Sequence, residues 1–334
     1  MLRFKCFEIE ALDFNERQVV VMKAVRFHEY GDPGVLRFED VERPVPGAGQ
    51  VLIRVAGTSF NGVDGNIRGG FMQGPIPVTL PHTPGIDVAG TVEALGEGVT
   101  GLEVGGQVVG FLPMVADGAA AQYAVAPAEV LTAAPATVAL ADAAALPTVG
   151  LTAWQALFEH AELAAGQRVL INGAGGGVGG YAVQLAKNAG AYVIAVAGPR
   201  SGEQVTKAGA DEVVDHTTTD VATAVTEPVD VVLNLAPVDP ERLAALVTLI
   251  RPGGVLVSTT VWMPAPSDDE RGVRGIDLFV RSDAEQLARL VALIDSGELH
   301  VDIAQRVPLA DLPTVHAQAA AGALPSGKTI IVAP

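Results

Sequence analysis

The sequence has a single cysteine, Cys6, among its 334 residues. One cysteine can form neither an internal disulfide bond nor a zinc site made of several thiolates. Basic residues are also scarce: 21 lysines and arginines stand against 38 aspartates and glutamates, which gives a formal net charge of −17. Nucleic acids and anionic membrane surfaces are bound by clusters of lysine and arginine. This charge balance therefore argues against both as partners.

Long apolar runs are absent too, although 49% of the residues are hydrophobic. The most apolar region, residues 130–158, is interrupted by two prolines, an aspartate and a glycine, whereas a membrane-spanning helix needs roughly 20 consecutive apolar residues. The N-terminal segment is acidic where an export signal would need an apolar core. We therefore expect no membrane span and a cytoplasmic location, which also suits a chain with one cysteine.

The pattern of apolar residues changes near residue 146. Before it, short and partly alternating segments are separated by turns rich in glycine and proline, such as Gly-Asp-Pro-Gly at 31–34, which predicts antiparallel strands. After it, continuous apolar runs such as 168–171 and 192–196 alternate with helical stretches, as in a parallel sheet covered on both faces. The chain is also long enough for two domains.

A glycine-rich turn is the strongest chemical signal. The apolar run at 168–171 leads into Ala-Gly-Gly-Gly-Val-Gly at 174–179, and a helical pattern follows. Glycines allow a tight turn and a close approach of the backbone to a pyrophosphate, whose charge then lies at the N-terminus of the helix. A second apolar run about twenty residues later completes a dinucleotide-binding pattern. The expected cofactor-binding residues here are Gly175, Gly176, Gly177, Val178 and Gly179; the alternative is a glycine-rich loop without a ligand.

The end of the second apolar run decides between the nicotinamide cofactors. An NAD-specific site usually has an acid there, which binds the ribose hydroxyls and repels a 2′-phosphate. This chain reads Ala-Gly-Pro-Arg-Ser at 197–201, and Arg200 and Ser201 can bind a phosphate. The pattern favours NADPH. Because Glu203 is an acid close to this position, NADH remains an alternative cofactor. The alternative role for Arg200 is that of a solvated surface residue.

Several further segments form a recognisable set. They are Met-Lys-Ala-Val-Arg-Phe at 22–27, Asn-Gly-Val-Asp at 61–64 followed by Arg68 and Gly70, Pro-Gly-Ile-Asp-Val-Ala-Gly at 84–90, Ala-Ala-Leu-Pro at 144–147 and Gly-Leu-Thr-Ala-Trp at 150–154. With the glycine turn, they make the chain from Met22 to Val332 resemble the medium-chain dehydrogenase/reductase superfamily, specifically its zinc-free quinone oxidoreductase (zeta-crystallin-like) branch. Two positions depart from that pattern, since Gly62 replaces a proline and Gln107 a common aspartate.

The resemblance implies an α/β fold in which a Rossmann domain, a doubly wound parallel sheet, is joined to a GroES-like antiparallel β domain. We expect an N-terminal extension at 1–21 that is dispensable, a GroES-like catalytic domain at 22–146 with a C-terminal return at 297–334, and the Rossmann NADP-binding domain at 147–296. A homodimer is also implied, and an exposed last strand at 276–280 would support it.

The resemblance argues against a metal. Zinc alcohol dehydrogenases have a cysteine where this chain has Asn61, and a His-Glu pair where it has Ile86 and Asp87. An isoleucine offers no lone pair to a metal, so the usual catalytic zinc site is not expected to form. Reduction would then depend on aligning the nicotinamide with the acceptor and on hydrogen bonds to the oxygen that gains charge.

The resemblance also supplies the remaining site residues. Asn61 is the candidate donor to a substrate carbonyl or to the nicotinamide ribose, and Asp64 would fix the same loop. Thr148 and Thr152 would contact the nicotinamide end, and His216 the adenosine phosphate. The alternatives are local: a turn-forming asparagine, helix-start threonines and a histidine that caps a loop. The proton donor stays open between a tyrosine, Tyr30 or Tyr123, and water.

We therefore predict an NADPH-dependent, zinc-independent oxidoreductase that delivers a hydride to a quinone or to an activated C=C bond of an enone. One or two apolar side chains would line the acceptor pocket, from the set Phe60, Phe71, Met72, Trp262 and Met263. One alternative is an enoyl thioester (acyl-CoA or acyl-carrier-protein) reductase of the same fold, for which a basic patch around Arg271, Arg274 and Arg281 is conceivable. The other is a non-catalytic NADPH-binding protein.

Overall fold

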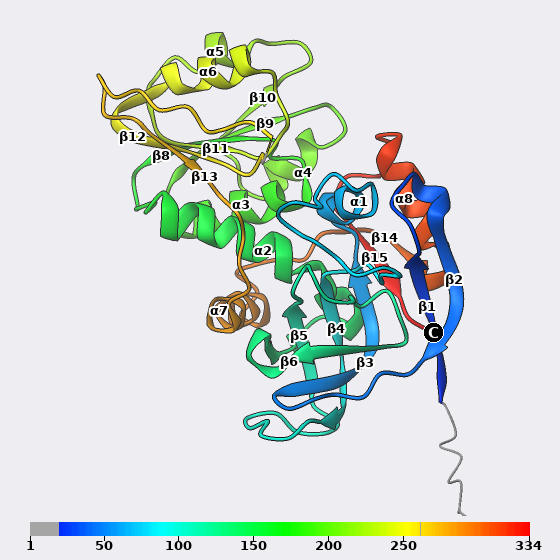
Figure 1. Cartoon of the computed structure of the whole chain (residues 1–334). Coiled ribbons are helices and arrows are strands. Elements are labelled where there is room, and N and C mark those ends of the chain that lie inside the picture. The colour runs from blue at the N-terminus through cyan, green and yellow to red at the C-terminus, as the bar shows by residue number, and fades with distance from the viewer. Residues whose placement is uncertain (1–19, 261) are drawn as a thin grey trace, which may run out of the picture.

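Two large β-sheets, one mostly antiparallel and one parallel, lie side by side (Figure 1). The computed structural model describes residues 20–260 and 262–334. Most of the predicted extension, residues 1–19, thus lies outside the described residues, and Val21 is already the first residue of strand β1 (Val21–Phe27). None of the described helices is both long and apolar enough to cross a membrane.

The first sheet has seven strands and combines early and late parts of the chain. Its strands are β3 (Gln50–Ser59), β4 (Asp87–Leu95), β5 (Gln107–Phe111), β6 (Tyr123–Pro127), β7 (Leu131–Ala133), β14 (Ile303–Pro308) and β15 (Lys328–Val332). Strand β15 pairs antiparallel with β3, so that Ile330 lies opposite Ser59. The C-terminal segment therefore returns to the antiparallel region. Beside it, β1 and β2 (Leu36–Glu42) form a two-stranded sheet.

The second sheet has six parallel strands in the order β10-β9-β8-β11-β12-β13. They are β8 (Arg168–Asn172), β9 (Tyr192–Ala197), β10 (Glu212–Asp215), β11 (Val229–Asn234), β12 (Ile250–Ser258) and β13 (Arg274–Asp277). This is the doubly wound order of a dinucleotide-binding sheet, which reverses between β8 and β11, and ligands bind beyond the carboxyl ends of such strands. The predicted fold class is confirmed. The last strand, however, ends at Asp277, earlier than the predicted 276–280 segment.

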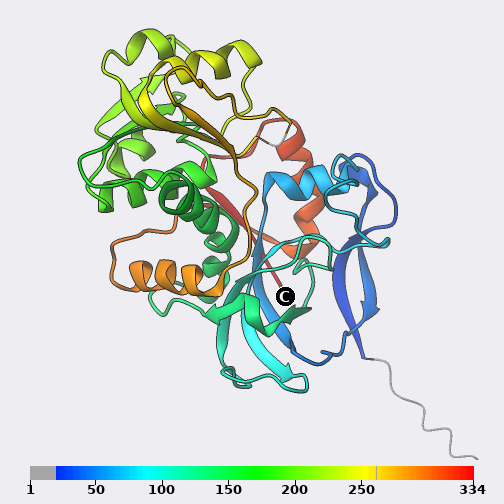
Figure 2. The same cartoon turned by 60° about the vertical axis from the view of Figure 1, so that its left-hand side comes forward.

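Helices cover the parallel sheet and fill the junction between the two sheets (Figure 2). The covering helices are α3 (Gly177–Asn188), α4 (Gly202–Lys207), α5 (Val221–Ala224) and α6 (Pro240–Thr248). The junction holds α2 (Pro147–Trp154) and α7 (Ala284–Asp295), whereas α1 (Gly62–Arg68) and α8 (Leu312–Ala320) lie in the other half. One apolar core runs through the junction, because Ile86 of the first half, Leu151 of α2 and Val169 of the parallel sheet belong to the same cluster.

The glycine turn between β8 and α3 needs residues without a Cβ at several positions. Gly173 has a φ of +89°, a conformation that favours glycine. A Cβ on Gly175 would overlap the Ser201 hydroxyl, and a Cβ on Gly179 would overlap the carbonyl oxygen of Ala174. Gly180, the next residue of the same helix, has open space where its Cβ would be. Gly175 thus lets the turn pack against Ser201, the residue before α4, and Gly179 lets α3 pack against Ala174 of the turn itself.

Adjacent glycines of α3 should therefore respond oppositely to alanine. Gly179→Ala must push Ala174 away and should lower the free energy of unfolding by roughly 1–3 kcal/mol, as overpacking does. Gly180→Ala adds helix propensity without a clash and should raise it by up to about 1 kcal/mol. Chemical denaturation of both variants measures these changes. Equal tolerance of alanine at the two positions would contradict the close packing at Gly179.

Candidate functional site

A cavity of about 720 Å³ opens at the carboxyl ends of the parallel strands. Its wall includes Asn172 at the end of β8 and Ala197 at the end of β9. Five predicted cofactor residues line it together: Gly175, Gly176, Arg200, Ser201 and His216. The cavity lies where a doubly wound sheet binds its ligand.

The two residues predicted to bind a phosphate differ in burial. Ser201 is buried and packs under the glycine turn, and its Oγ donates to the carbonyl oxygen of Gly198 at 3.4 Å. Arg200 is exposed at the cavity wall, as is His216, whose Nε2 lies beside Gly198. Ser201 therefore also supports the turn, whereas Arg200 and His216 face the space that a ligand would fill.

Charges around the cavity favour an anion. Glu203, the acid for which NADH remained an alternative cofactor, is not part of the cavity wall. Its carboxylate lies 2.6 Å from Nζ of Lys207 on the exposed side of α4. Arg242 of α6, which the sequence analysis missed, does line the cavity. Its guanidinium lies 3.3 Å from Asp239, which caps the same helix. The acid in the wall, Asp220, accepts a hydrogen bond from the backbone of Thr223 at the start of α5.

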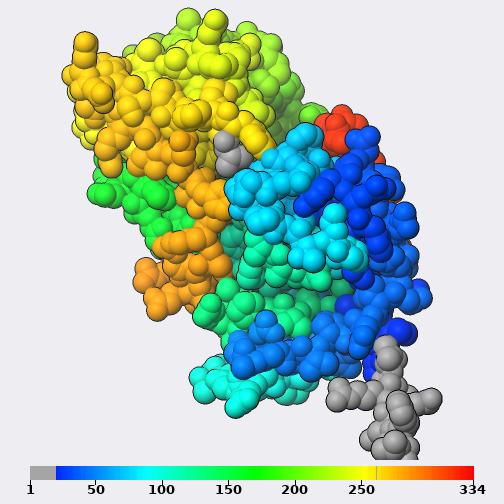
Figure 3. Space-filling model, in the orientation of Figure 1, coloured from blue at the N-terminus to red at the C-terminus, as the bar shows by residue number. Residues whose placement is uncertain are grey.

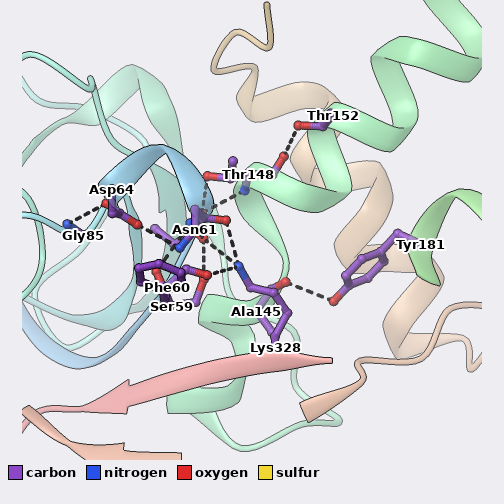
Figure 4. Close-up of polar contacts among 11 residues, drawn as sticks. Ser59, Phe60, Asn61, Asp64, Gly85, Ala145, Thr148, Thr152, Tyr181 and Lys328 are labelled. Atoms are coloured by element: carbon purple, nitrogen blue, oxygen red, sulfur yellow. Dashed lines mark hydrogen bonds and ion pairs between the residues drawn. The ribbon is translucent and has the colours of Figure 1, made fainter. Parts of the chain in front are cut away.

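A second cluster of polar groups surrounds the carboxylate of Asp87, at the start of β4. Figure 4 labels three of its members, Ser59, Asn61 and Thr148. Asp87 is fully buried. Its Oδ1 accepts hydrogen bonds from the backbone N and the Oγ1 of Thr148, at 2.8 and 2.7 Å. Its Oδ2 accepts from the Ser59 hydroxyl at 2.5 Å and from Nδ2 of Asn61 at 2.8 Å. Four donors on one carboxylate are the pattern of an ionised group.

Lys328, another residue that the sequence analysis missed, completes this cluster. The ammonium of this buried lysine donates to the carbonyl oxygen of Phe60 at 2.9 Å and to Oδ1 of Asn61 at 2.8 Å, and it lies 3.8 Å from Oδ2 of Asp87. Burial lowers the pKa of Lys328, and the nearby carboxylate of Asp87 opposes that shift. Its side chain also passes the glycine turn, because a Cβ on Gly177 would lie 3.1 Å from Cδ of Lys328.

The amide of Asn61 is occupied by protein partners. Besides its bonds to Lys328 and Asp87, its Nδ2 donates to the carbonyl oxygen of Ser59 at 3.4 Å. Donation to a substrate, the role expected from the resemblance, would require Asn61 to give up one of these bonds. Geometry therefore favours an orienting role for this side chain.

The two threonines also make internal contacts. Thr148 donates to Asp87, and the hydroxyl of Thr152 donates to the carbonyl oxygen of Thr148 at 2.6 Å within α2. Gly177, Val178 and Gly179 are not part of the cavity wall; Gly177 adjoins Lys328, and Gly179 packs on Ala174. Five predicted residues thus line the cavity, Asn61 and Thr148 belong to the cluster around Asp87, and Gly179 packs within the turn.

Of the five predicted apolar pocket residues, Phe60 and Met72 belong to the same apolar cluster and the other three do not. Met72 is buried in the core. Phe60 stacks edge-on against His316, with ring centroids 4.9 Å apart, and Met263 packs on the core of the parallel sheet. Phe71 and Trp262 are exposed. The acceptor pocket therefore stays a prediction.

Metal ligands are missing from the cluster around Asp87. The described part of the chain has no group of three histidine, cysteine, aspartate or glutamate side chains that could share a metal ion. The groups around Asp87 are hydroxyls, an amide and the ammonium of Lys328. A cation thus already neutralises this carboxylate, and the donor set lacks the nitrogen and sulfur ligands that zinc prefers.

Asp64 should make stability depend on pH. Its buried carboxylate accepts hydrogen bonds from the backbone of Asn61 and Gly85, yet burial raises the pKa of Asp64 from 3.8 to about 7. Between these values the folded protein holds a proton that the unfolded chain releases. The free energy of unfolding should therefore fall as the pH rises through this window, by at most roughly 1.4 kcal/mol per pH unit from this group, and level off above it.

Asp64→Asn removes the titrating group, so the difference between the parent and the variant isolates this contribution. Urea unfolding of both proteins from about pH 4 to about pH 8 measures it. Parallel pH profiles for the two proteins would show that Asp64 does not titrate in this range.

Comparisons with known proteins agree with this architecture. Two family models match, "Alcohol dehydrogenase GroES-like domain" over residues 47–136 and "Zinc-binding dehydrogenase" over residues 208–331. The chain is 41% identical over 205 residues to the chloroplast envelope quinone oxidoreductase homolog of Arabidopsis thaliana. That match covers 59% of the chain and 62% of the plant protein, less than two thirds of its length.

Other relatives match over nearly their whole length. The quinone oxidoreductase of Homo sapiens is 32% identical over 330 residues, which cover 93% of the chain and 98% of that protein. Among solved structures, the quinone oxidoreductase from Coxiella burnetii superposes with a TM-score of 0.85 at 28% identity, over 94% of the chain and 99% of that structure. The chain therefore belongs to the medium-chain dehydrogenase/reductase superfamily, in its quinone oxidoreductase branch.

Proposed function

We propose that this protein is an NADPH-dependent oxidoreductase that passes a hydride to a quinone or to the activated C=C bond of an enone, without a metal ion. The observation that carries the proposal is the cavity of about 720 Å³ at the carboxyl ends of the parallel strands. It unites the glycine turn with Arg200 and Arg242, and Glu203 stands outside its wall.

The residues present fit a nicotinamide dinucleotide phosphate. Backbone groups of Gly175 and Gly176, at the N-terminus of α3, would hold the pyrophosphate. Arg200, with Ser201 and His216, would hold the adenosine phosphate, and Arg242 adds a second positive charge to the same wall. When bound, the reduced nicotinamide supplies the hydride. The protein contributes binding, alignment and exclusion of water.

The acceptor is assigned from the family. The relatives from Arabidopsis thaliana and Homo sapiens both carry quinone oxidoreductase in their names. The enoyl thioester alternative needs a basic path for a long phosphopantetheine chain, and two of the three arginines considered for it are engaged. Arg281 pairs with Glu159 and Asp283, and Arg271 pairs with Asp268 and donates to backbone carbonyl oxygens. A quinone or enone is therefore preferred.

Metal independence rests on the cluster around Asp87. Although one matching family model is described as zinc-binding, the cluster places the ammonium of Lys328 next to Asp87 and Asn61 and offers no histidine or cysteine. A homodimer and a cytoplasmic location stay predictions. The dimer is supported by β13, which forms one edge of the parallel sheet.

The reaction is tested by following NADPH absorbance with quinones, enones and enoyl thioesters, each repeated with NADH. We expect turnover with quinones or enones, faster with NADPH than with NADH, and unchanged after treatment with a metal chelator. Turnover restricted to enoyl thioesters would support the alternative reductase. Cofactor binding without any turnover would support the hypothesis of a non-catalytic NADPH-binding protein. Loss of activity on treatment with the chelator, restored by added zinc, would contradict metal independence.

Arg200 should discriminate between the two cofactors. Arg200→Ala removes a charge-assisted contact to the 2′-phosphate and should weaken NADPH binding by roughly 1.5–3 kcal/mol, about tenfold to a hundredfold. NADH lacks this phosphate, so its affinity should hardly change. Fluorescence titration with both cofactors measures the difference, and Arg289→Ala, an equal loss of charge on the exposed side of α7, is the control.

Equal losses for the two cofactors would show that Arg200 is structural. Tighter binding of NADH than of NADPH by the parent protein would overturn the cofactor assignment. Arg242→Ala in the same titration shows whether the second arginine of the wall contributes to phosphate binding.

A further inference from the structure

Lys328 is a buried cation to which the proposed hydride transfer assigns no role. It opens β15, the strand that pairs with β3, and its side chain is only 5% exposed. Lysine is almost never buried to this extent unless it is paired. An ammonium taken out of water is strongly destabilising without a countercharge and hydrogen-bond acceptors.

The surroundings of Lys328 form a pocket of oxygen atoms. Its Nζ lies 2.9 Å from the carbonyl oxygen of Phe60 and 2.8 Å from Oδ1 of Asn61 (Figure 4). It also lies 3.8 Å from Oδ2 of Asp87. All three oxygens can accept, and the carboxylate supplies the countercharge. The pocket is therefore matched to a cation that donates hydrogen bonds.

This pocket joins parts of the chain that are far apart in sequence. Phe60 and Asn61 follow β3, Asp87 begins β4, and Thr148, which holds the other oxygen of Asp87, belongs to α2. The Lys328 stem runs beside Gly177 at the start of α3, because a Cβ on Gly177 would lie 3.1 Å from Cδ of Lys328. Lys328 is thus in contact with both the loop that carries Asn61 and the glycine turn of the cofactor cavity.

We propose that Lys328 is a built-in cation that positions Asn61 and Asp87 relative to the glycine turn, and that hydride transfer requires this positive charge at this place. In this arrangement Lys328 orients Asn61: Oδ1 of the amide accepts from the ammonium, so Nδ2 must point to Asp87, and Asn61 in turn holds the carboxylate of Asp87 in place. Lys328 itself is a positioning residue that acts through Asn61.

The proposal predicts that a small ammonium ion can replace the side chain. Lys328→Ala leaves a cavity about as long as n-propylammonium, with the oxygen pocket at its end. This ion should raise the melting temperature of Lys328→Ala and leave that of the parent unchanged. Lys187→Ala is the control, since Lys187 forms an ion pair with Asp211 at a more open site and leaves no such pocket. 1-Propanol, similar in shape but uncharged, and tetramethylammonium, which cannot donate, should have no effect.

The turnover measurement rests on the proposed function, whereas the melting measurement does not. Lys328→Ala should reduce kcat at least tenfold, since small misplacements of reacting groups have effects of that size. Addition of n-propylammonium should restore part of the loss, and Lys328→Arg, which keeps the charge, should lose less than Lys328→Ala. Parent turnover near zero with every acceptor would refute the proposed function, while rescue in the melting measurement would still support the cation pocket.

A second variant separates charge from packing if Lys328→Ala does not fold. Lys328→Met combined with Asp87→Asn removes both charges. The amide of Asn61 can then flip, so that its Oδ1 accepts a hydrogen bond from the new asparagine at position 87. We expect this double variant to be more stable than Lys328→Met alone, yet to show the same loss of turnover. The proposal is overturned if n-propylammonium changes neither melting nor turnover, or if the double variant reacts like the parent.

Discussion

A carboxylate that is removed from water must be surrounded by donors or by a countercharge, and Asp87 has both. Ser59, Asn61 and Thr148 supply four hydrogen bonds, and Lys328 supplies the positive charge. These partners come from the end of β3, the residue before α1, the start of α2 and the start of β15. Satisfying one buried charge therefore fixes how the antiparallel region, the C-terminal return and the first helix of the junction meet. On the outside of the molecule, the cyan part of the first half lies directly against the yellow and orange part of the second half (Figure 3).

The glycine turn connects this cluster with the cofactor cavity. At each of three glycines a different neighbour lies where a Cβ would be: Ser201 at Gly175, the stem of Lys328 at Gly177 and the carbonyl oxygen of Ala174 at Gly179. Two of these contacts hold neighbouring parts of the protein against the turn, and the third closes α3 onto its own beginning. The motif is therefore as much a packing device as a phosphate cradle. That explains why Gly177 and Gly179 do not line the cavity itself.

Local patterns sufficed for most of the strands, the glycine turn and part of the cavity wall. Arg200, Ser201 and His216 follow apolar strands, and the carboxyl ends of parallel strands meet at one edge of a sheet. Lys328 and Arg242 could not be found in this way, because each joins its site through tertiary contacts with segments far away in sequence. The only local sign of Lys328 is a charged residue at the head of an otherwise apolar strand. Both amide atoms of Asn61 are hydrogen-bonded to protein groups, Nδ2 to Asp87 and Oδ1 to Lys328. Because these partners are distant in sequence, the residue type alone could not reveal that the amide is occupied.

The net charge of −17 shows why composition limits partners but does not choose a ligand. Arg281 and Arg271 are largely neutralised by adjacent acids, so they create little attraction for an anion despite lying near each other in sequence. Arg200 and Arg242 instead line one cavity, where a bound cofactor would displace water from around both guanidinium groups, although Arg242 also pairs with Asp239 of its own helix. Attraction between unlike charges grows as the effective dielectric constant falls. A few arginines whose positions leave them facing a cavity can therefore bind an anionic cofactor on a strongly acidic protein.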